Sequence, residues 1–257
     1  MSFERAGLKA LAALLALFAL AASAHADGDI AALMAQGDAY DAKLDNVHAL
    51  EAYLKAEKLG ATGANTLYKI ARQYALRMND TTSESAQRDL AETALVYAKR
   101  AIAANPKSAK AQLSAAVCYG RLVSFVSSKQ KVEYSRLIKE HADLALQLDP
   151  TDSYAWHILG VWNYELAKMG PIMRGLVKVV YGGIPPASNE EAARLLSKAV
   201  ALAPDRVSHH VELGRTYLAL GLKEQARTEL QRGLALPDRE KDDPVSKQRA
   251  RDALSDL

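Results

Sequence analysis

The stretch Ile138-Lys-Glu-His-Ala-Asp-Leu-Ala-Leu-Gln-Leu-Asp-Pro150-Thr-Asp-Ser-Tyr-Ala-Trp-His-Ile-Leu-Gly160 decides the fold. Ile138, Ala142 and Ala145 stand four and three residues apart, which is the spacing of one face of an α-helix. Pro150 ends this helix, because proline lacks an amide hydrogen and disfavours helical geometry in the residue before it. A second apolar face then leads to Gly160, which is small enough to let another helix approach closely. The stretch therefore predicts a helix end, a proline turn and a helix start.

The same unit recurs around Pro106 and Pro204, and upstream with Ala61 in the proline position. Small or apolar residues return at fixed distances on both sides of each of these positions. Six, nine, ten and thirteen residues after the prolines stand Gln112, Ala115, Ala116 and Tyr119; Trp156, Leu159, Gly160 and Asn163; and His210, Leu213, Gly214 and Tyr217. Twelve, eight and five residues before them stand Ala94, Ala98 and Ala101; Ile138, Ala142 and Ala145; and Ala192, Leu196 and Ala199. This is the tetratricopeptide pattern, a repeated helix–turn–helix of roughly 34 residues.

The pattern predicts an all-α fold: a superhelical solenoid of about five expanded tetratricopeptide (TPR) helical hairpins plus a C-terminal capping helix. We expect a single domain over 27–257, with units near 30–63, 64–108, 109–152, 153–206 and 207–240 and the cap at 241–257. The positions equivalent to the prolines are 45, 44 and 54 residues apart, so the middle units exceed the usual repeat. Their extra segments are expected between the two helices, and the longest is an insert at 166–189.

The N-terminus has the features of an export signal. Arg5 and Lys9 precede an uninterrupted apolar run, and a small-x-small site ends at Ala26. These features predict a cleavable signal peptide over 1–26, cut between Ala26 and Asp27. We therefore expect the protein to be periplasmic or secreted.

The composition argues against several function classes. A formal charge of +3, with no long basic run interleaved with aromatics, does not favour nucleic-acid binding. Cys118 is the single cysteine, so an intrachain disulfide and a multi-cysteine metal site are excluded. His209 and His210 are adjacent and would point about 100° apart on a helix, which disfavours a metal site.

We find no motif of a phosphate-binding loop, a nucleophile elbow or a zinc peptidase, so we expect no enzyme activity and no cofactor. Cys118 is interpreted as a small buried hydrophobe, and His141 and His157 as hydrogen-bonding at helix interfaces.

Several runs of sequence are similar to the regulator of microtubule dynamics family. The similar runs are 138–145 with Asp149-Pro150, then 157–165, 181–192 and 212–217, within a resemblance that covers roughly 64–236. The resemblance implies a helical-repeat adaptor, whose animal members are associated with microtubules and organelle contact sites. It supplies no catalytic residues. The export signal departs from this picture, so microtubules are not the partner we expect.

The insert has two interpretations. Apolar residues at helical spacing (Ile172, Met173, Leu176, Val177, Val179 and Val180) accompany Arg174 and Lys178, and no acidic residue occurs between Glu165 and Glu190. One interpretation is a helix that docks a partner or a membrane surface. The other is that its apolar side packs against the repeats and the following Gly-Gly-Ile-Pro-Pro run turns the chain back.

These features lead to one preferred function and one alternative. The preferred function is a non-catalytic TPR adaptor or scaffold that mediates protein–protein interactions in the cell envelope. The alternative is a peripheral membrane- or envelope-associating protein that uses the cationic amphipathic insert 171–181. The candidate partner-binding residues are Tyr119, Tyr164, Lys168, Arg174, Lys178 and Tyr181.

Overall fold

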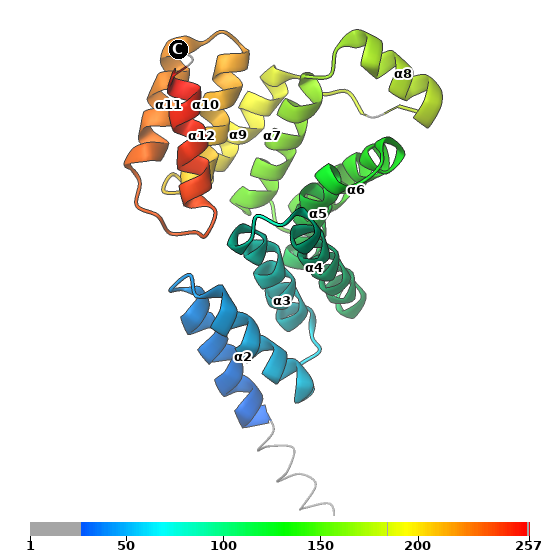
Figure 1. Ribbon diagram of the computed structural model, residues 1–257, viewed down its shortest axis with the longest axis vertical. Helices are drawn as coiled ribbons and strands as arrows, with labels where there is room; N and C mark the ends of the chain where they lie inside the picture. The colour runs from blue at the N-terminus through cyan, green and yellow to red at the C-terminus, as the bar shows by residue number, and fades with distance from the viewer. Residues whose placement is uncertain (1–26, 184, 256) are drawn as a thin grey trace, which may run out of the picture. The chain divides into compact units, whose positions relative to one another are not determined.

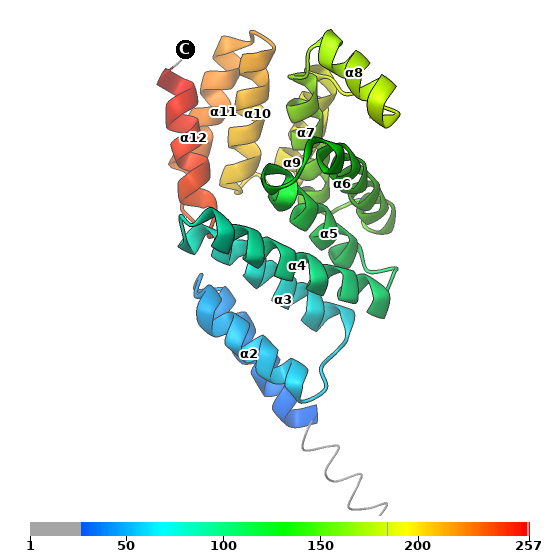
Figure 2. The same ribbon diagram turned by 45° about the vertical axis from the view of Figure 1, so that its right-hand side comes forward.

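The computed structural model describes residues 27–183, 185–255 and 257, and the predicted signal peptide lies outside the described part. The chain forms two compact units, one ending at Thr62 and one running from Gly63 to Leu257. The described residues form helices and turns without a strand (Figures 1 and 2), so the prediction of an all-α, TPR-like fold is confirmed.

The first unit is a pair of helices, 27–41 and α2 (Asn46–Lys58). Tyr53 is fully buried between them, and its hydroxyl donates a hydrogen bond of 2.7 Å to Asp38 Oδ1. The Tyr53 ring occupies the space in which a side chain at Gly37 would stand. A glycine in the first helix thus makes room for an aromatic ring in the second.

The second unit is a series of helical hairpins, one in each of the four remaining predicted repeats (Figure 1). The pairs are α3 (Ala64–Arg77) with α4 (Glu84–Ala104), α5 (Ala109–Leu122) with α6 (Ser128–Leu148), α7 (Ser153–Ala167) with α9 (Asn189–Leu202), and α10 (Val207–Ala219) with α11 (Lys223–Ala235). The chain ends in α12 (Asp243–Ser255). Ala250 of α12 is fully buried against Val207, Val211 and Leu230, as expected of a helix that covers the last repeat.

Side chains of complementary size meet where the two helices of a hairpin cross. A Cβ atom at Gly160 would lie 2.5 Å from Leu196 Cγ, and one at Gly214 would lie 2.7 Å from Leu230 Cγ. The equivalent positions in the two preceding hairpins are all buried alanines: Ala71 with Ala98, and Ala116 with Ala142. Each crossing therefore holds either glycine opposite a large residue or alanine opposite alanine, which keeps the crossing closely packed.

Each proline turn is closed by the side chain six residues further on. Gln112 Nε2 donates to the carbonyl of Pro106 at 2.9 Å, and Trp156 Nε1 donates to that of Pro150 at 2.9 Å. His210 Nε2 lies 2.9 Å from the carbonyl of Pro204. Three different residue types thus bond the equivalent proline carbonyl in three turns. Each carbonyl lies just after a helix end, where the backbone has no partner within a helix.

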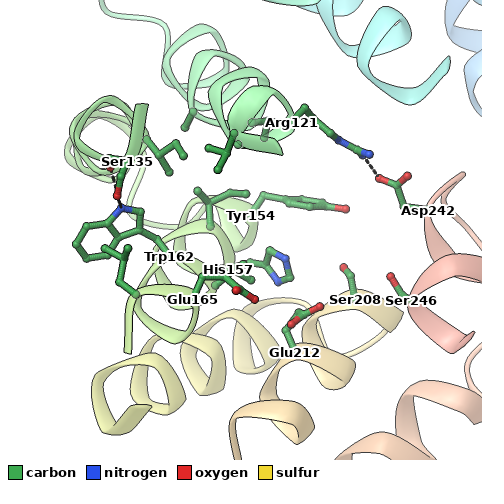
Figure 3. Close-up of a pocket in the computed structure, with 18 of the residues that line it drawn as sticks. Arg121, Ser135, Tyr154, His157, Trp162, Glu165, Ser208, Glu212, Asp242 and Ser246 are labelled. Carbon is green, nitrogen blue, oxygen red and sulfur yellow. Dashed lines mark hydrogen bonds and ion pairs between the residues drawn. The ribbon is translucent and has the colours of Figure 1, made fainter. Parts of the chain in front are cut away.

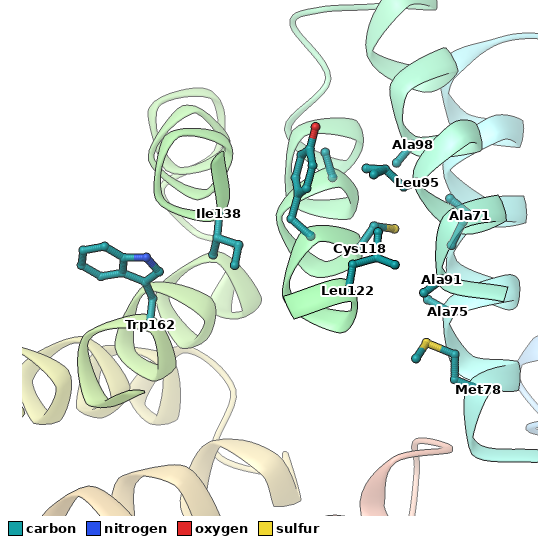
Figure 4. Close-up of a cluster of buried hydrophobic side chains, with 13 residues drawn as sticks. Ala71, Ala75, Met78, Ala91, Leu95, Ala98, Cys118, Leu122, Ile138 and Trp162 are labelled. Carbon is teal, nitrogen blue, oxygen red and sulfur yellow. The ribbon is translucent and has the colours of Figure 1, made fainter. Parts of the chain in front are cut away.

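The central core runs from α3 to α7, and alanine is its most frequent residue (Figure 4). Cys118 lies within it, 1% exposed, near Leu95 and Leu122. Burial raises the pKa of its thiol to about 12, because a thiolate is poorly solvated there. Cys118 is thus a small core residue, as its position on an apolar helix face predicts.

The two shorter extra segments lie between the helices of their hairpins and also extend the second helices. The 3₁₀ turns η1 (Met78–Asp80) and η2 (Val123–Phe125) follow the first helices, and the second helices α4 and α6 are each 21 residues long. Much of the additional chain thus lengthens helices, since Ser83 and Ser127 cap them early.

The long insert contains a separate helix, α8 (Pro171–Tyr181), between α7 and α9. Pro171 stands in its first turn, where a missing amide hydrogen costs nothing. Gly182 ends the helix with a left-handed backbone conformation, at φ +75°. Its amide donates a hydrogen bond of 3.1 Å to the carbonyl of Lys178. The Gly183 amide donates to Val177 O at 3.1 Å and completes the terminating turn. Over the described part of the chain, no helix is both long and apolar enough to cross a bilayer.

A candidate binding groove

The second unit contains a groove with a volume of about 630 Å³ (Figure 3). Its walls come from α5, α7 and α10, the first helices of three hairpins, and from α6 and α12. First helices of successive repeats lie side by side, so a groove on their common face follows from the stacking of the repeats.

One end of the groove is apolar. It is lined by Val117, Ile158, Val161, Trp162 and Met169, among others. Trp162 Nε1 donates to the backbone carbonyl of Ser135 at 2.7 Å, so the indole is held with its polar atom satisfied. This end can accept an apolar side chain without leaving a buried donor unpaired.

The other end is polar and includes Tyr154, His157, Ser208 and Glu212 (Figure 3). The His157 ring stacks on His209 with 4.8 Å between centroids, and their Nδ1 atoms are 3.1 Å apart. Burial, and then the nearby positive charges, lowers the pKa of His157 to about 4. Burial, followed by the neighbouring His157, lowers the pKa of His209 to about 2. Both rings are therefore neutral at pH 7, and one Nδ1–H is shared between them.

The carboxylates of the groove are matched by cations of the same chain. Glu165 pairs with Lys168 at 2.9 Å, and Glu212 pairs with Arg215 at 2.7 Å. Asp242 pairs with Arg121 at 2.5 Å. By contrast, Lys131 is exposed, and among the described residues it has no ion-pair partner. Lys131 is thus a groove-lining cation that no carboxylate of the described residues neutralises.

A strap formed by residues 237–242, between α11 and α12, crosses to the earlier repeats. Asp242 bonds both Arg121 and Asn79, and Lys241 pairs with Asp80 at 2.9 Å. Glu240 accepts hydrogen bonds from the Tyr154 hydroxyl and from Arg206. These bonds join the C-terminal segment to η1, α5, α7 and α10, and so border the polar end of the groove.

Two of the three tyrosines predicted to bind a partner, Tyr119 and Tyr164, are buried. Tyr119 is 6% exposed, and its ring packs 4.9 Å from that of Tyr134 and 5.8 Å from that of His141. Tyr164 is 8% exposed and lies beneath Lys168 Nζ, 4.1 Å from the ring centroid. Neither tyrosine lines the groove, because each stands near the end of the first helix of its hairpin on a side that packs against neighbouring residues.

The predicted residues of the insert differ in their environments. Arg174 donates from Nε to Met169 O and from Nη2 to Leu166 O and Ala187 O, at 2.9 to 3.2 Å, so it holds the base of the insert. Lys178 is exposed, and Lys168 is exposed and paired with Glu165. The side chain of Tyr181 lies outside the described part. The structure therefore does not bring the five candidates whose side chains it describes together in one site.

Sequence reasoning placed His209 and His210 on different sides of a helix, and they do have different partners. His210 lies between Glu229 Oε2, at 2.6 Å, and the Pro204 carbonyl. The contact of His209 with His157 was missed, because these residues are 52 positions apart and meet only when α7 packs beside α10. The strap was missed as well, although its run of charged residues, 238–243, is visible in the sequence.

Residues 33–257 match the family described as Regulator of microtubule dynamics protein 1-3. The chain belongs to the regulator of microtubule dynamics family. Regulator of microtubule dynamics protein 1 of Mus musculus is 30% identical over 239 residues, which cover 92% of this chain and 78% of the mouse protein. The protein of the same name from Homo sapiens is 32% identical, but that alignment covers 56% of this chain and 46% of the human protein.

Solved structures show the same fold as this member of the regulator of microtubule dynamics family. A thermophilic TPR protein of Thermus thermophilus has a TM-score of 0.65 at 17% identity and covers 88% of this chain and 99% of its own. The pilF protein of Pseudomonas aeruginosa has a TM-score of 0.54 at 14% identity, covering 90% of this chain and 87% of its own. At these identities the likeness concerns the fold alone.

Proposed function

We propose that this protein is a non-catalytic adaptor whose groove holds an extended segment of a partner protein. The supporting observation is the groove of about 630 Å³, with an apolar end on α6 and α7 and the exposed Lys131 beside it. An apolar side chain of the partner would enter beside Trp162 and Met169. An adjacent acidic residue would face Lys131, so the partner is an extended segment in which an apolar residue neighbours Asp or Glu.

The ion pairs of the groove support an acidic partner segment over a basic one. Its carboxylates already pair with Lys168, Arg215 and Arg121, so a basic segment would have to compete with cations of the chain. An acidic segment instead gains Lys131, and it also meets Arg249, whose side chain is 56% exposed and lies 3.5 Å from Glu212. Opposite charges at the rim of an interface set specificity and association rate more than total affinity.

Peptide selection tests the proposal directly. A displayed library of random linear peptides is selected on the chain, and the dissociation constants of selected peptides are measured by fluorescence polarisation. We expect apolar residues next to Asp or Glu to be enriched. Lys131→Glu and Met169→Glu should each weaken binding about tenfold or more, which corresponds to roughly 1.4 kcal/mol.

Lys129→Glu is the matched control, since Lys129 is exposed on the same helix and does not line the groove. It makes the same change in net charge and should alter the dissociation constant less than twofold. Equal weakening by both lysine variants would show a non-specific charge effect. A selection that yields no peptide sensitive to Met169→Glu would overturn the groove as the site.

We propose that this adaptor works in the cell envelope, on the basis of the predicted signal peptide over 1–26. Expression of the full chain with its own leader should give a mature protein that begins at Asp27. N-terminal sequencing after fractionation checks this. A product that retains its first residues in the cytoplasm would contradict export, and the microtubule association of its animal relatives would then become the next hypothesis.

A further inference from the structure

The helix α8 presents large apolar side chains to the outside of the second unit. Ile172 is 90% exposed and Val179 is 85% exposed, the two highest values among the large apolar residues that the structure describes. At about 100° per residue, positions 172, 175 and 179 share one helix face, and position 175 is the exposed Gly175. Among the α8 side chains that the structure describes, this face has an exposed apolar residue at each end and a glycine between them.

This face is held outward by the way in which the insert is built. Val177, on the opposite side of α8, is buried. Arg174 is tied to three backbone carbonyls, and Arg136 of α6 donates from Nη2 to Gly183 O at 2.5 Å and from Nε at 3.1 Å. Both ends of the helix are therefore fixed to the repeats by hydrogen bonds. The apolar side chains are exposed on a helix that is held in place. Figures 1 and 2 both show α8 at the edge of the second unit, away from α10 to α12.

The charged residues in the sequence of the insert are of one sign. The sequence has no acidic residue between Glu165 and Glu190, while Lys178 is exposed and adjacent to Val179. An amphipathic helix that combines a shallow apolar face with flanking cations suits the interface of an anionic bilayer, where the apolar residues enter the headgroup boundary and the cations meet lipid phosphates.

We propose that α8 docks the protein peripherally on an anionic membrane surface, with Ile172 and Val179 inserted and Lys178 facing the headgroups. A bilayer is the occupant that the described residues favour, because the exposed Ile172 and Val179 stand beside the exposed Lys178, and the insert sequence has no acidic residue to repel anionic headgroups. This site is distinct from the binding groove, since none of the described side chains of α8 lines that groove. Membrane docking and peptide binding can therefore succeed or fail separately.

Co-sedimentation with vesicles tests the proposal. The mature chain is mixed with phosphatidylcholine vesicles containing about 30% phosphatidylglycerol and with vesicles of phosphatidylcholine alone. Binding is expected on the anionic vesicles, with at least a fivefold weaker partition on the neutral ones. The double variant Ile172→Gln with Val179→Gln should reduce partition about tenfold, and Lys178→Glu should reduce it severalfold.

Val96→Gln is the control for loss of an exposed apolar side chain, because Val96 is 56% exposed on α4, away from the insert. It should leave partition unchanged.

Failure of the unmodified chain to bind anionic vesicles, or equal partition of the double variant, would overturn the proposal. Sedimentation velocity reports the alternative of a second copy: a dimer that becomes monomeric in the double variant would make this face a self-association interface. If the double variant no longer binds the peptides selected on the groove, and the unmodified chain does not bind vesicles, the face belongs to a protein partner.

Discussion

Gly160→Val should be among the most destabilising single substitutions in the second unit, lowering the free energy of unfolding by about 3 kcal/mol. A Cβ atom at this position would lie 2.5 Å from Leu196 Cγ, 2.9 Å from Leu196 Cδ2 and 3.3 Å from the Leu196 backbone nitrogen. The branched side chain cannot be accommodated by moving the tip of Leu196 alone, so α7 and α9 must separate. Urea unfolding followed by far-ultraviolet circular dichroism measures the loss.

Two controls distinguish crowding from an effect of the residue type. Gly120, also in a helix, has no atom within 4 Å of where its Cβ would stand, so Gly120→Ala should stabilise the chain by roughly 0.5 to 1 kcal/mol. Shortening the opposing side chain should relieve the clash, so Gly160→Ala combined with Leu196→Ala should cost less than the sum of the two single changes. Additive losses would mean that Gly160 and Leu196 do not share one packing site.

The same pair of positions shows why so much of the fold is predictable from the sequence. Gly160 and Leu196 occupy repeat positions ten residues after one proline and eight before the next. Gly214 with Leu230 forms an equivalent contact, ten residues after Pro204 and seven before Pro237. Helix periodicity and proline turns are local properties, and stacking equivalent hairpins brings equivalent positions together without further information.

The candidate site was less predictable, because it depends on contacts between distant parts of the chain. Asp242 reaches Arg121 over 121 positions, and Trp162 reaches Ser135 across a helix pair. Periodicity indicates which residues face inward, but it does not distinguish a core position from a groove wall. Tyr119 and Tyr164 illustrate this, since both are buried in the repeats and neither lines the groove.

The second large effect is a loss of stability on mild acidification, caused by the stacked pair of His157 and His209. In the unfolded chain these rings bind protons below pH of about 6.5. In the folded chain burial keeps them neutral, because it lowers the pKa of His157 to about 4 and that of His209 to about 2. The unfolded state thus binds more protons in this window, so the free energy of unfolding must fall as the pH is lowered. Each ring contributes a slope that approaches roughly 1.4 kcal/mol per pH unit.

Urea midpoints measured from pH of about 7.5 to about 4.5 check this dependence, because most carboxyl groups stay ionised over that range. Burial also lowers the pKa of His141, which adds to the same trend. His209→Phe keeps an aromatic ring against His157 but cannot take up a proton, so it should remove the largest single share of the slope between pH of about 6.5 and about 5. If His209→Phe and the unmodified chain lose stability in parallel, His209 must already be protonated in the folded protein, and the neutral histidine pair beside the groove would be wrong.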